Sequence, residues 1–280
     1  MRLRVFLISL MVLVLGFVGV VWYVLSRPFP KPPPLVLPPS CTVETDAGTV
    51  TLDTTQIANA ATIAAVGIRR AMPDQAIVIA LATAMQESKL ENLDGGDRDS
   101  IGLFQQRPSQ GWGTPENIAD PRYAAGMFYT ALNKVKGWQN MRITEAAQRV
   151  QRSAYPEAYD QWATSATVMT EAFVGKAPAT LACARLDPPD TRGSAAATAL
   201  STGLKADWGD LSVGTSAGGL TVTPASATAG WQYAHWLVAH AAGRGISRVH
   251  YSDQEWTAAS GVWAKASAPA SEVIAEVYPA

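Results

Sequence analysis

Residues 73–113 read PDQAIVIALATAMQESKLENLDGGDRDSIGLFQQRPSQGWG, and this stretch decides how the rest of the chain is interpreted. Pro73 and Asp74 are typical of the first turn of a helix. The apolar side chains that follow fall on almost every face of a helical wheel, which predicts a central, buried helix. Glu87 lies at the end of this helix, and an Asp- and Gly-rich loop then leads into residues 101–106, where we expect a small β-hairpin.

Glu87 is the only acidic residue between Asp74 and Glu91. Burial at the end of an apolar helix disfavours the ionised form of a carboxyl group. Cleavage of a glycosidic bond needs such a group, because the general acid must be protonated when it meets the leaving oxygen. Taken alone, a glutamate near a helix end is more commonly an exposed residue, and it is the loop and hairpin after Glu87 that favour catalysis.

A second carboxylate would be needed if the reaction were a hydrolysis with inversion, in order to activate water. Asp94, Asp97 and Asp99, in the loop after Glu87, are the candidates for this role. The alternative for each of these aspartates is turn formation through bonds between side chain and backbone.

These residues together resemble a known signature. Glu87-Ser88, a polar loop and then Gly-Leu-Phe-Gln at 102–105 resemble the E-S…G-L-M-Q pattern of soluble lytic transglycosylases and goose-type lysozymes. Gly-Asp-Arg at 96–98 resembles the goose-type loop, and Ala154-Tyr155 is similar to the A-Y-N-A-G segment, although Pro156 replaces its asparagine. The resemblance covers residues 55–175 and implies cleavage of the β-1,4 bond between N-acetylmuramic acid and N-acetylglucosamine in peptidoglycan.

The resemblance also implies roles for particular side chains. Glu87 would act as general acid and then as base, with no metal or cofactor. The resemblance also makes Asp97 the best candidate for a second carboxylate, with Asp94 and Asp99 as competitors. Substrate-binding positions are expected in and around the same motifs, at Ser88, Gln105, Gln106, Trp112 and Tyr155. Packing of Trp112 onto the core is an equally good interpretation. A lytic transglycosylase needs no second acid, because the substrate completes the displacement itself, so transglycosylase and hydrolase both stay open.

The charge balance argues against a role in binding nucleic acid. The chain of 280 residues has a formal net charge of −1. Three of its 22 basic side chains lie in residues 1–27, which leaves 19 against 23 acidic ones. The remainder is slightly acidic and gives such a role no electrostatic support.

Residues 1–26 are predicted to be a signal anchor. Arg2 and Arg4 precede an apolar run over 5–25, which at about 1.5 Å per residue can cross a hydrocarbon core of roughly 30 Å. A cleaved signal peptide is the alternative. We therefore expect a single-pass protein of the cell membrane, with most of the chain on the extracellular face. The Pro-rich residues 27–40 are expected to form a stiff stalk.

The sequence contains only two cysteines, Cys41 and Cys183. In an oxidising compartment an even pair predicts a disulfide, and this one would join the two ends of one domain. Two free, buried thiols are the alternative.

The predicted fold is a mainly α lysozyme-like domain with a small β-hairpin, over residues 41–186, preceded by one transmembrane helix. Residues 187–228 are rich in Ala, Ser, Thr and Gly, which predicts a partly disordered linker. Residues 229–280 are expected to form a small α+β module.

The end of the chain weakly resembles zinc-dependent D-alanyl-D-alanine carboxypeptidases. It lacks their metal ligands, because His235, His240 and His250 are not at ligand spacing. We expect this module to bind the wall, to contact cell-wall enzymes or to serve in packing. For the whole chain the alternative to an enzyme is a catalytically silent peptidoglycan-binding or scaffold protein.

Overall fold

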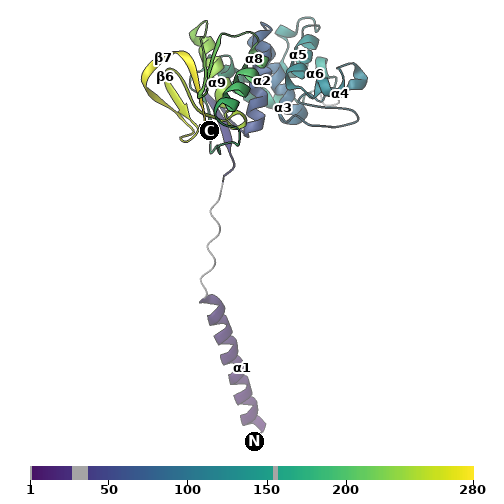
Figure 1. The fold of residues 1–280 in the computed structure, drawn as a ribbon. Helices are drawn as coiled ribbons and strands as arrows, with labels where there is room; N and C mark the ends of the chain where they lie inside the picture. The colour runs from purple at the N-terminus through teal and green to yellow at the C-terminus, as the bar shows by residue number, and fades with distance from the viewer. Residues whose placement is uncertain (1, 27–36, 154–156) are drawn as a thin grey trace. The chain divides into compact units, whose positions relative to one another are not determined.

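The predicted helix around residue 80 is confirmed as α3 (Asp74–Ser88) in the computed structural model, which describes all residues except 1, 27–36 and 154–156. The side chains at 2–10, 12, 24 and 25 are likewise outside the description. The chain divides into two units, residues 1–37 and 38–280 (Figure 1).

The first unit contains α1 (Arg2–Leu25). Among the residues that the structure describes, no helix has both the length and the apolar composition needed to cross a membrane. The predicted transmembrane anchor and the single-pass location are therefore wrong on this finding. Most of the predicted stalk lies outside the described residues.

The second unit is a mixed α+β structure. Its helices, in chain order, are α2 (Thr54–Arg69), α3, α4 (Pro115–Ile118), α5 (Pro121–Leu132), α6 (Ile143–Gln151), α7 (Ala163–Phe173), α8 (Gly193–Trp208), α9 (Ala227–Ala239) and α10 (Ala241–Arg244). Short 3₁₀ helices are η1 (Pro108–Gln110), η2 (Trp138–Asn140) and η3 (Asp160–Trp162).

The strands form two antiparallel sheets. One has the order β2 (Gly48–Leu52), β1 (Ser40–Thr45), β3 (Leu181–Ala184). The other has the order β4 (Val213–Ser216), β5 (Gly219–Val222), β7 (Trp263–Val277), β6 (Ile246–Thr257). The predicted hairpin near residue 101 is smaller than expected, because only an isolated bridge between Ile101 and Gln106 forms there.

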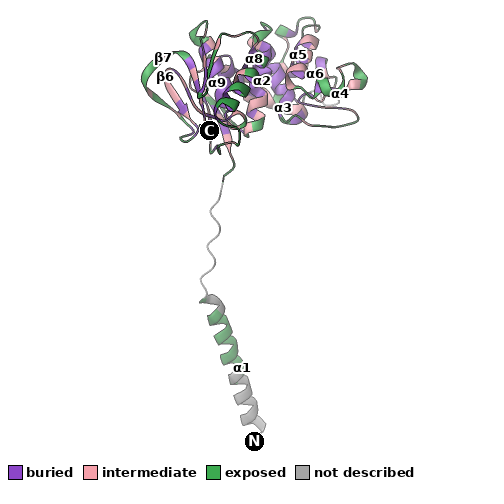
Figure 2. Ribbon diagram, in the orientation of Figure 1, coloured by how far each residue is buried: buried purple, intermediate pink, exposed green. Residues whose placement is uncertain are grey.

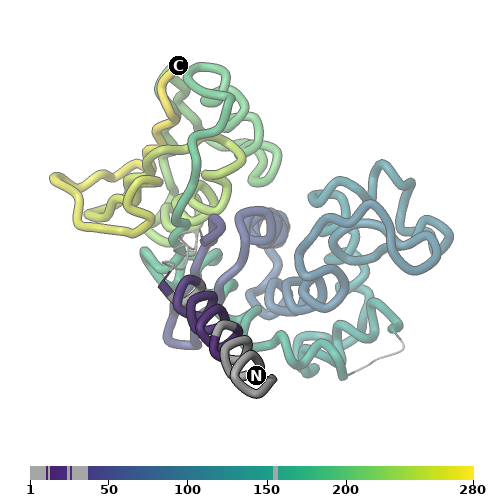
Figure 3. Tube along the Cα trace, turned by 90° about the horizontal axis from the view of Figure 1, so that it is seen from below, coloured from purple at the N-terminus to yellow at the C-terminus, as the bar shows by residue number. Residues whose placement is uncertain are grey.

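Helix α2 lies at the centre of the second unit. It begins with a capping box, in which the Asp53 carboxylate accepts from backbone N–H groups and the Gln56 side chain accepts from the Asp53 N–H. It packs against α3 and α5 on one side and against α8 and α9 on the other (Figures 1 and 3). Its Ala-rich face, like most of α3, is buried (Figure 2). The small side chains of α2 therefore let elements from both halves of the unit approach one helix.

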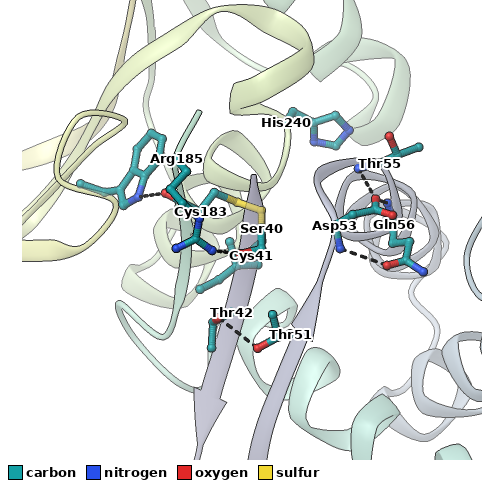
Figure 4. The surroundings of a disulfide bond; sticks show 12 residues. Ser40, Cys41, Thr42, Thr51, Asp53, Thr55, Gln56, Cys183, Arg185 and His240 are labelled. Atoms are coloured by element: carbon teal, nitrogen blue, oxygen red, sulfur yellow. Dashed lines mark hydrogen bonds between the residues drawn. A yellow bond between two sulfur atoms is a disulfide. The ribbon is translucent and has the colours of Figure 1, made fainter. Parts of the chain in front are cut away.

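The predicted disulfide between Cys41 and Cys183 is confirmed. The two cysteines are register partners on β1 and β3, and both are buried (Figure 4). Their sequence separation is 142 residues, so the bond closes most of the unit into one loop. Arg185 donates to the Ser40 hydroxyl beside it at 2.6 Å.

The expected linker at 187–228 is instead largely structured. It contains α8, β4 and β5, within the same unit as the rest of residues 38–280. The physical reason is a helical stripe that the small-residue composition concealed, since Leu200, Leu204 and Trp208 recur every four residues and are all buried. Residues 229–280 are therefore not a separate module.

The C-terminal hairpin of β6 and β7 is bonded to the disulfide-bearing sheet. The Trp256 indole N–H donates to the Cys183 carbonyl at 3.2 Å, and the Trp263 indole N–H donates to the Leu181 carbonyl at 2.7 Å. Both acceptors lie on β3, the edge strand of the smaller sheet. The two tryptophans thus satisfy carbonyl groups that an open edge would leave unpaired.

A buried carboxylate joins the two sides of α2. Asp207 of α8 is fully buried and accepts from the Thr62 hydroxyl at 2.9 Å and from the Trp236 indole at 2.7 Å. Arg122 of α5 lies 2.5 Å from its other oxygen. Removal of one partner would leave a buried group unpaired, which makes this pair costly to break.

His240 lies beside this carboxylate, stacked on Trp236 with ring centroids 3.9 Å apart. Burial lowers the pKa of His240 to about 4; the Asp207 charge opposes the shift, and the nearby Arg244 charge adds to it. The imidazole is therefore neutral in the folded chain across the physiological pH range.

Loss of the disulfide is expected to lower the free energy of unfolding by about 4–5 kcal/mol, because a large loop is then opened in the unfolded chain. The comparison is urea denaturation of the wild type and of the Cys41→Ser, Cys183→Ser double variant. Reduced wild type is the control that separates loop closure from the side-chain change. If the free energy of unfolding fell by less than about 1 kcal/mol in both the double variant and the reduced wild type, the expectation would be wrong.

Stability is expected to fall as the pH drops from about 6.5 to about 4. The unfolded chain protonates His240 in this range while the folded chain does not, so protons favour unfolding. Denaturant midpoints measured at several pH values test this. His240→Gln should give a shallower dependence over the same range, and an unchanged slope in the variant would show that His240 is not responsible.

Candidate active site

Glu87 is the penultimate residue of α3, and its side chain is half-buried rather than sealed in the core. The Tyr159 hydroxyl donates to Glu87 Oε1 at 2.7 Å. Tyr159 itself is fully buried. Burial raises the pKa of Tyr159, and the negative charge of Glu87 and the hydrogen bond to it raise that pKa further. The phenol therefore stays a donor to Glu87 at neutral pH.

The turn after Glu87 is fixed by α2. Lys89 and Leu90 both adopt left-handed backbone conformations, with φ of 57° and 63°. Gln56 Nε2 donates to the Lys89 carbonyl at 2.9 Å, and Asn59 Nδ2 donates to the Leu90 carbonyl at 2.7 Å. These bonds set where α3 ends and so where Glu87 points.

The segment around η3 contacts the same end of α3. Gln86 Oε1 accepts from Gln161 Nε2 at 3.0 Å and from the Trp162 indole at 2.9 Å. The Lys89 ammonium lies 4.2 Å from the centre of the Trp162 ring, a cation–π distance. Burial lowers the pKa of Lys89, and the Glu87 charge opposes that shift. Glu87 therefore has a tyrosine and a lysine as electrostatic neighbours.

Ser88 connects the helix to the motif at 102–105. It is buried, and its hydroxyl donates to the Leu103 carbonyl at 2.8 Å while also contacting the Ala84 carbonyl. Gln151 Nε2 donates to the next carbonyl, that of Phe104, at 2.8 Å. Ser88 was predicted to bind substrate, and the structure places it instead as a backbone clamp that holds the motif against Glu87.

Gln105 lies over the Gly-rich loop. Its backbone φ is 47°, and its Nε2 donates to the Gly102 carbonyl at 3.3 Å. A Cβ atom built on Gly96 would lie 1.7 Å from Gln105 Oε1, so a larger residue at position 96 would require this amide to move. The half-buried side chain of Gln105 thus lies between the motif and the loop.

Gln106 and Trp112 face the protein. Gln106 is buried, pairs with Ile101 through its backbone, and donates from Nε2 to the Ala124 carbonyl at 3.0 Å. The half-buried Trp112 packs against the core, and its carbonyl accepts from the Tyr123 hydroxyl. The structure therefore favours packing for Gln106, while one part of Trp112 stays accessible.

The predicted aspartates differ in environment. The Asp97 side chain is 91% exposed, with Arg98 3.9 Å away as its ion partner. Asp99 accepts from Arg107 Nε at 2.8 Å and from the Ser109 N–H at 2.7 Å. The Arg107 and Ser109 bonds hold the pKa of Asp99 well below its usual range. Asp99 therefore stabilises the loop through its bonds to Arg107 and Ser109, whereas the Asp97 side chain extends into solvent.

Tyr155, which was predicted to bind substrate, lies outside the described residues. The tyrosine that does reach Glu87 is Tyr159, which the sequence interpretation missed. A signal was present, because Ala-Tyr occurs twice in SAYPEAYDQW, at 154–155 and again at 158–159.

Throughout the described part of the chain, no group of three or more His, Cys, Asp and Glu side chains could hold a metal ion. His235 is buried, and its Nδ1 lies 2.8 Å from the Ala172 carbonyl. His235 and His240 are thus parts of the core.

Comparison with known proteins gives no family. No family model matches the chain, and no curated protein matches it. The resemblance to lytic transglycosylases and goose-type lysozymes therefore rests on the motif residues alone.

The bond between Tyr159 and Glu87 is expected to give a coupling free energy of about 1–2 kcal/mol, since the acceptor is a partly buried carboxylate. The measurement is a double-mutant cycle of urea stabilities with Tyr159→Phe and Glu87→Ala. Tyr123→Phe, which also loses one hydroxyl donor, is the control and should show no coupling to Glu87→Ala. Equal coupling for both tyrosines would refute a direct bond.

Proposed function

We propose that the chain cleaves glycan strands of peptidoglycan at the β-1,4 bond between N-acetylmuramic acid and N-acetylglucosamine. The observation that carries the proposal is the 2.7 Å hydrogen bond from Tyr159 to Glu87, at the end of a buried helix and next to the Gly-Leu-Phe-Gln motif. A half-buried carboxyl group, oriented by a tyrosine and open on one side, is suited to general acid catalysis.

In this proposal Glu87 donates its proton to the glycosidic oxygen as the bond breaks. Tyr159 orients the carboxyl and stabilises the carboxylate that remains after proton transfer. Gln105 is the amide of the Gly-Leu-Phe-Gln motif; it donates to the Gly102 carbonyl, lies beside Gly96 and would bind the sugar. Glu87 then removes a proton from the attacking nucleophile in the second step.

The surroundings of the aspartates favour a second step without another carboxylate. The Asp99 carboxylate is already bonded to Arg107 and Ser109. The Asp97 side chain is exposed, and among the described residues its ion partner is Arg98. An intramolecular attack by the substrate, as in a lytic transglycosylase, needs neither of them. A muramidase that uses Asp97 is the weaker alternative, because nothing holds that side chain at a defined distance from Glu87.

A catalytically silent peptidoglycan-binding protein would share the same surface around Glu87 and differ only in turnover. The hydrogen-bonded state of Glu87 favours the enzyme, since a binding surface has no need for a partly buried carboxylate with a dedicated donor.

Glu87→Gln is expected to lower the release of soluble fragments from purified sacculi by at least about 100-fold, because the acid is lost while the shape is kept. Turbidity of a sacculus suspension is the measurement. Glu91→Gln is the matched control, since Glu91 is an exposed glutamate four residues away, and it should act like the wild type. Equal release by the Glu87→Gln variant would make Glu87 non-catalytic.

A further inference from the structure

Two cavities lie along α5. The larger, about 680 Å³, is bordered by Trp112, the end of α5 and the end of α6. The smaller, about 220 Å³, is bordered by the end of α2 and the start of α5. Met127 and Thr130 line both, so the cavities meet at these two side chains and form one groove, here called the α5 groove.

The α5 groove is lined by cations and by no acid. The basic residues among its lining side chains are Arg69, Arg70, Arg122, Lys134, Arg149 and Arg152. Arg122 is paired with Asp207 and Asp120, and Arg149 with Glu145. The other four form no ion pair with any described residue. A chain with a net charge of −1 therefore gathers unpaired positive charge in one groove.

The guanidinium groups are held in place with donors to spare. Arg70 donates to the Thr130 hydroxyl at 2.8 Å, and Arg69 donates to the Ala206 carbonyl at 2.9 Å. A guanidinium has five N–H donors, so several remain for a ligand. Fixed guanidinium forks match the geometry of carboxylate and phosphate oxygens.

Helix α6 connects the groove to the motif. Gln151 lines the larger cavity, and its Nε2 donates to the carbonyl of Phe104, a fully buried residue of the motif, at 2.8 Å. Trp112 lines the same cavity. Gln151 therefore belongs both to the groove and to the packing that holds the motif.

We propose that the α5 groove binds the peptide stems of the glycan strand through their carboxylates. This inference rests on the proposed function, because it takes the strand at Glu87 as its starting point. A strand that carries peptide stems has regularly spaced carboxylates beside neutral sugars. The α5 groove has complementary groups, because its cations suit the carboxylates, and the Gln151 amide and the Trp112 indole suit the sugars. Cations near the C-terminal ends of α2, α5 and α6 also favour the helix dipole, but the dipole accounts neither for Arg122 at the start of α5 nor for the absence of acids from the groove.

The test uses the full chain with Glu87→Gln, so that bound strands are not cut. The probes are fluorescently labelled soluble glycan strands with peptide stems, the same strands after amidase removal of the stems, and a single-stranded DNA of matched length. Arg70→Gln with Lys134→Gln removes one cation from each cavity. Lys205→Gln with Lys265→Gln is the control, because it removes two exposed charges outside the groove.

The groove variant is expected to weaken binding of stem-bearing strands about fivefold at low salt, as two exposed ion pairs are lost. It should leave stripped strands unchanged, and the control should change neither. Equal weakening of both strands, or of neither, overturns the proposal, and tighter groove-dependent binding of DNA assigns the groove to nucleic acid instead. If wild type fails to cleave sacculi while stem-dependent binding persists, the catalytic proposal falls and the groove assignment stands.

Discussion

The end of α3 is the constraint on which the site depends. Two amides of α2, Gln56 and Asn59, hold the carbonyls of a left-handed pair, Lys89 and Leu90, and so stop the helix directly after Glu87 and Ser88. Non-glycine residues in this conformation cost free energy and persist only where the surroundings hold them. The orientation of Glu87 is therefore set by the helix behind it.

The same helix makes the C-terminal part of the chain necessary to the site. Helix α2 packs against α8 and α9 as well as α3 and α5, and Asp207 links Thr62 of α2 to Arg122 of α5. The disulfide and the indoles of Trp256 and Trp263 fix the remaining edge of the unit. Residues far apart in sequence thus form one structure around α2.

Local rules explain what the sequence predicted well. The buried helix around residue 80 follows from apolar residues on every face, and the disulfide follows from an even pair of cysteines at the ends of a predicted domain. The position of Glu87 at a helix end and the nearby motif were likewise readable, because they depend on neighbours in sequence.

Contacts between residues far apart in the chain explain the features of the site and the fold that the sequence did not predict. Tyr159 reaches Glu87 across 72 residues, and no local pattern distinguishes it from Tyr155. Ser88 and Gln106 are polar, but bonds to the Leu103 and Ala124 carbonyls bury them. In α8 the small residues concealed a stripe that packs on α2. The apolar run at 5–25 was interpreted as a span, which the described part of α1 does not support.

The proposed role of Glu87 is to cut a glycosidic bond rather than an amide or a peptide bond. Mass spectrometry of the fragments that the full chain releases from sacculi tests it most directly. The account predicts disaccharide-peptides that end in muramic acid, with a 1,6-anhydro ring if the substrate completes the displacement and a reducing end if water does. Uncut glycan strands accompanied by free peptides, or no soluble fragments at all, would contradict it.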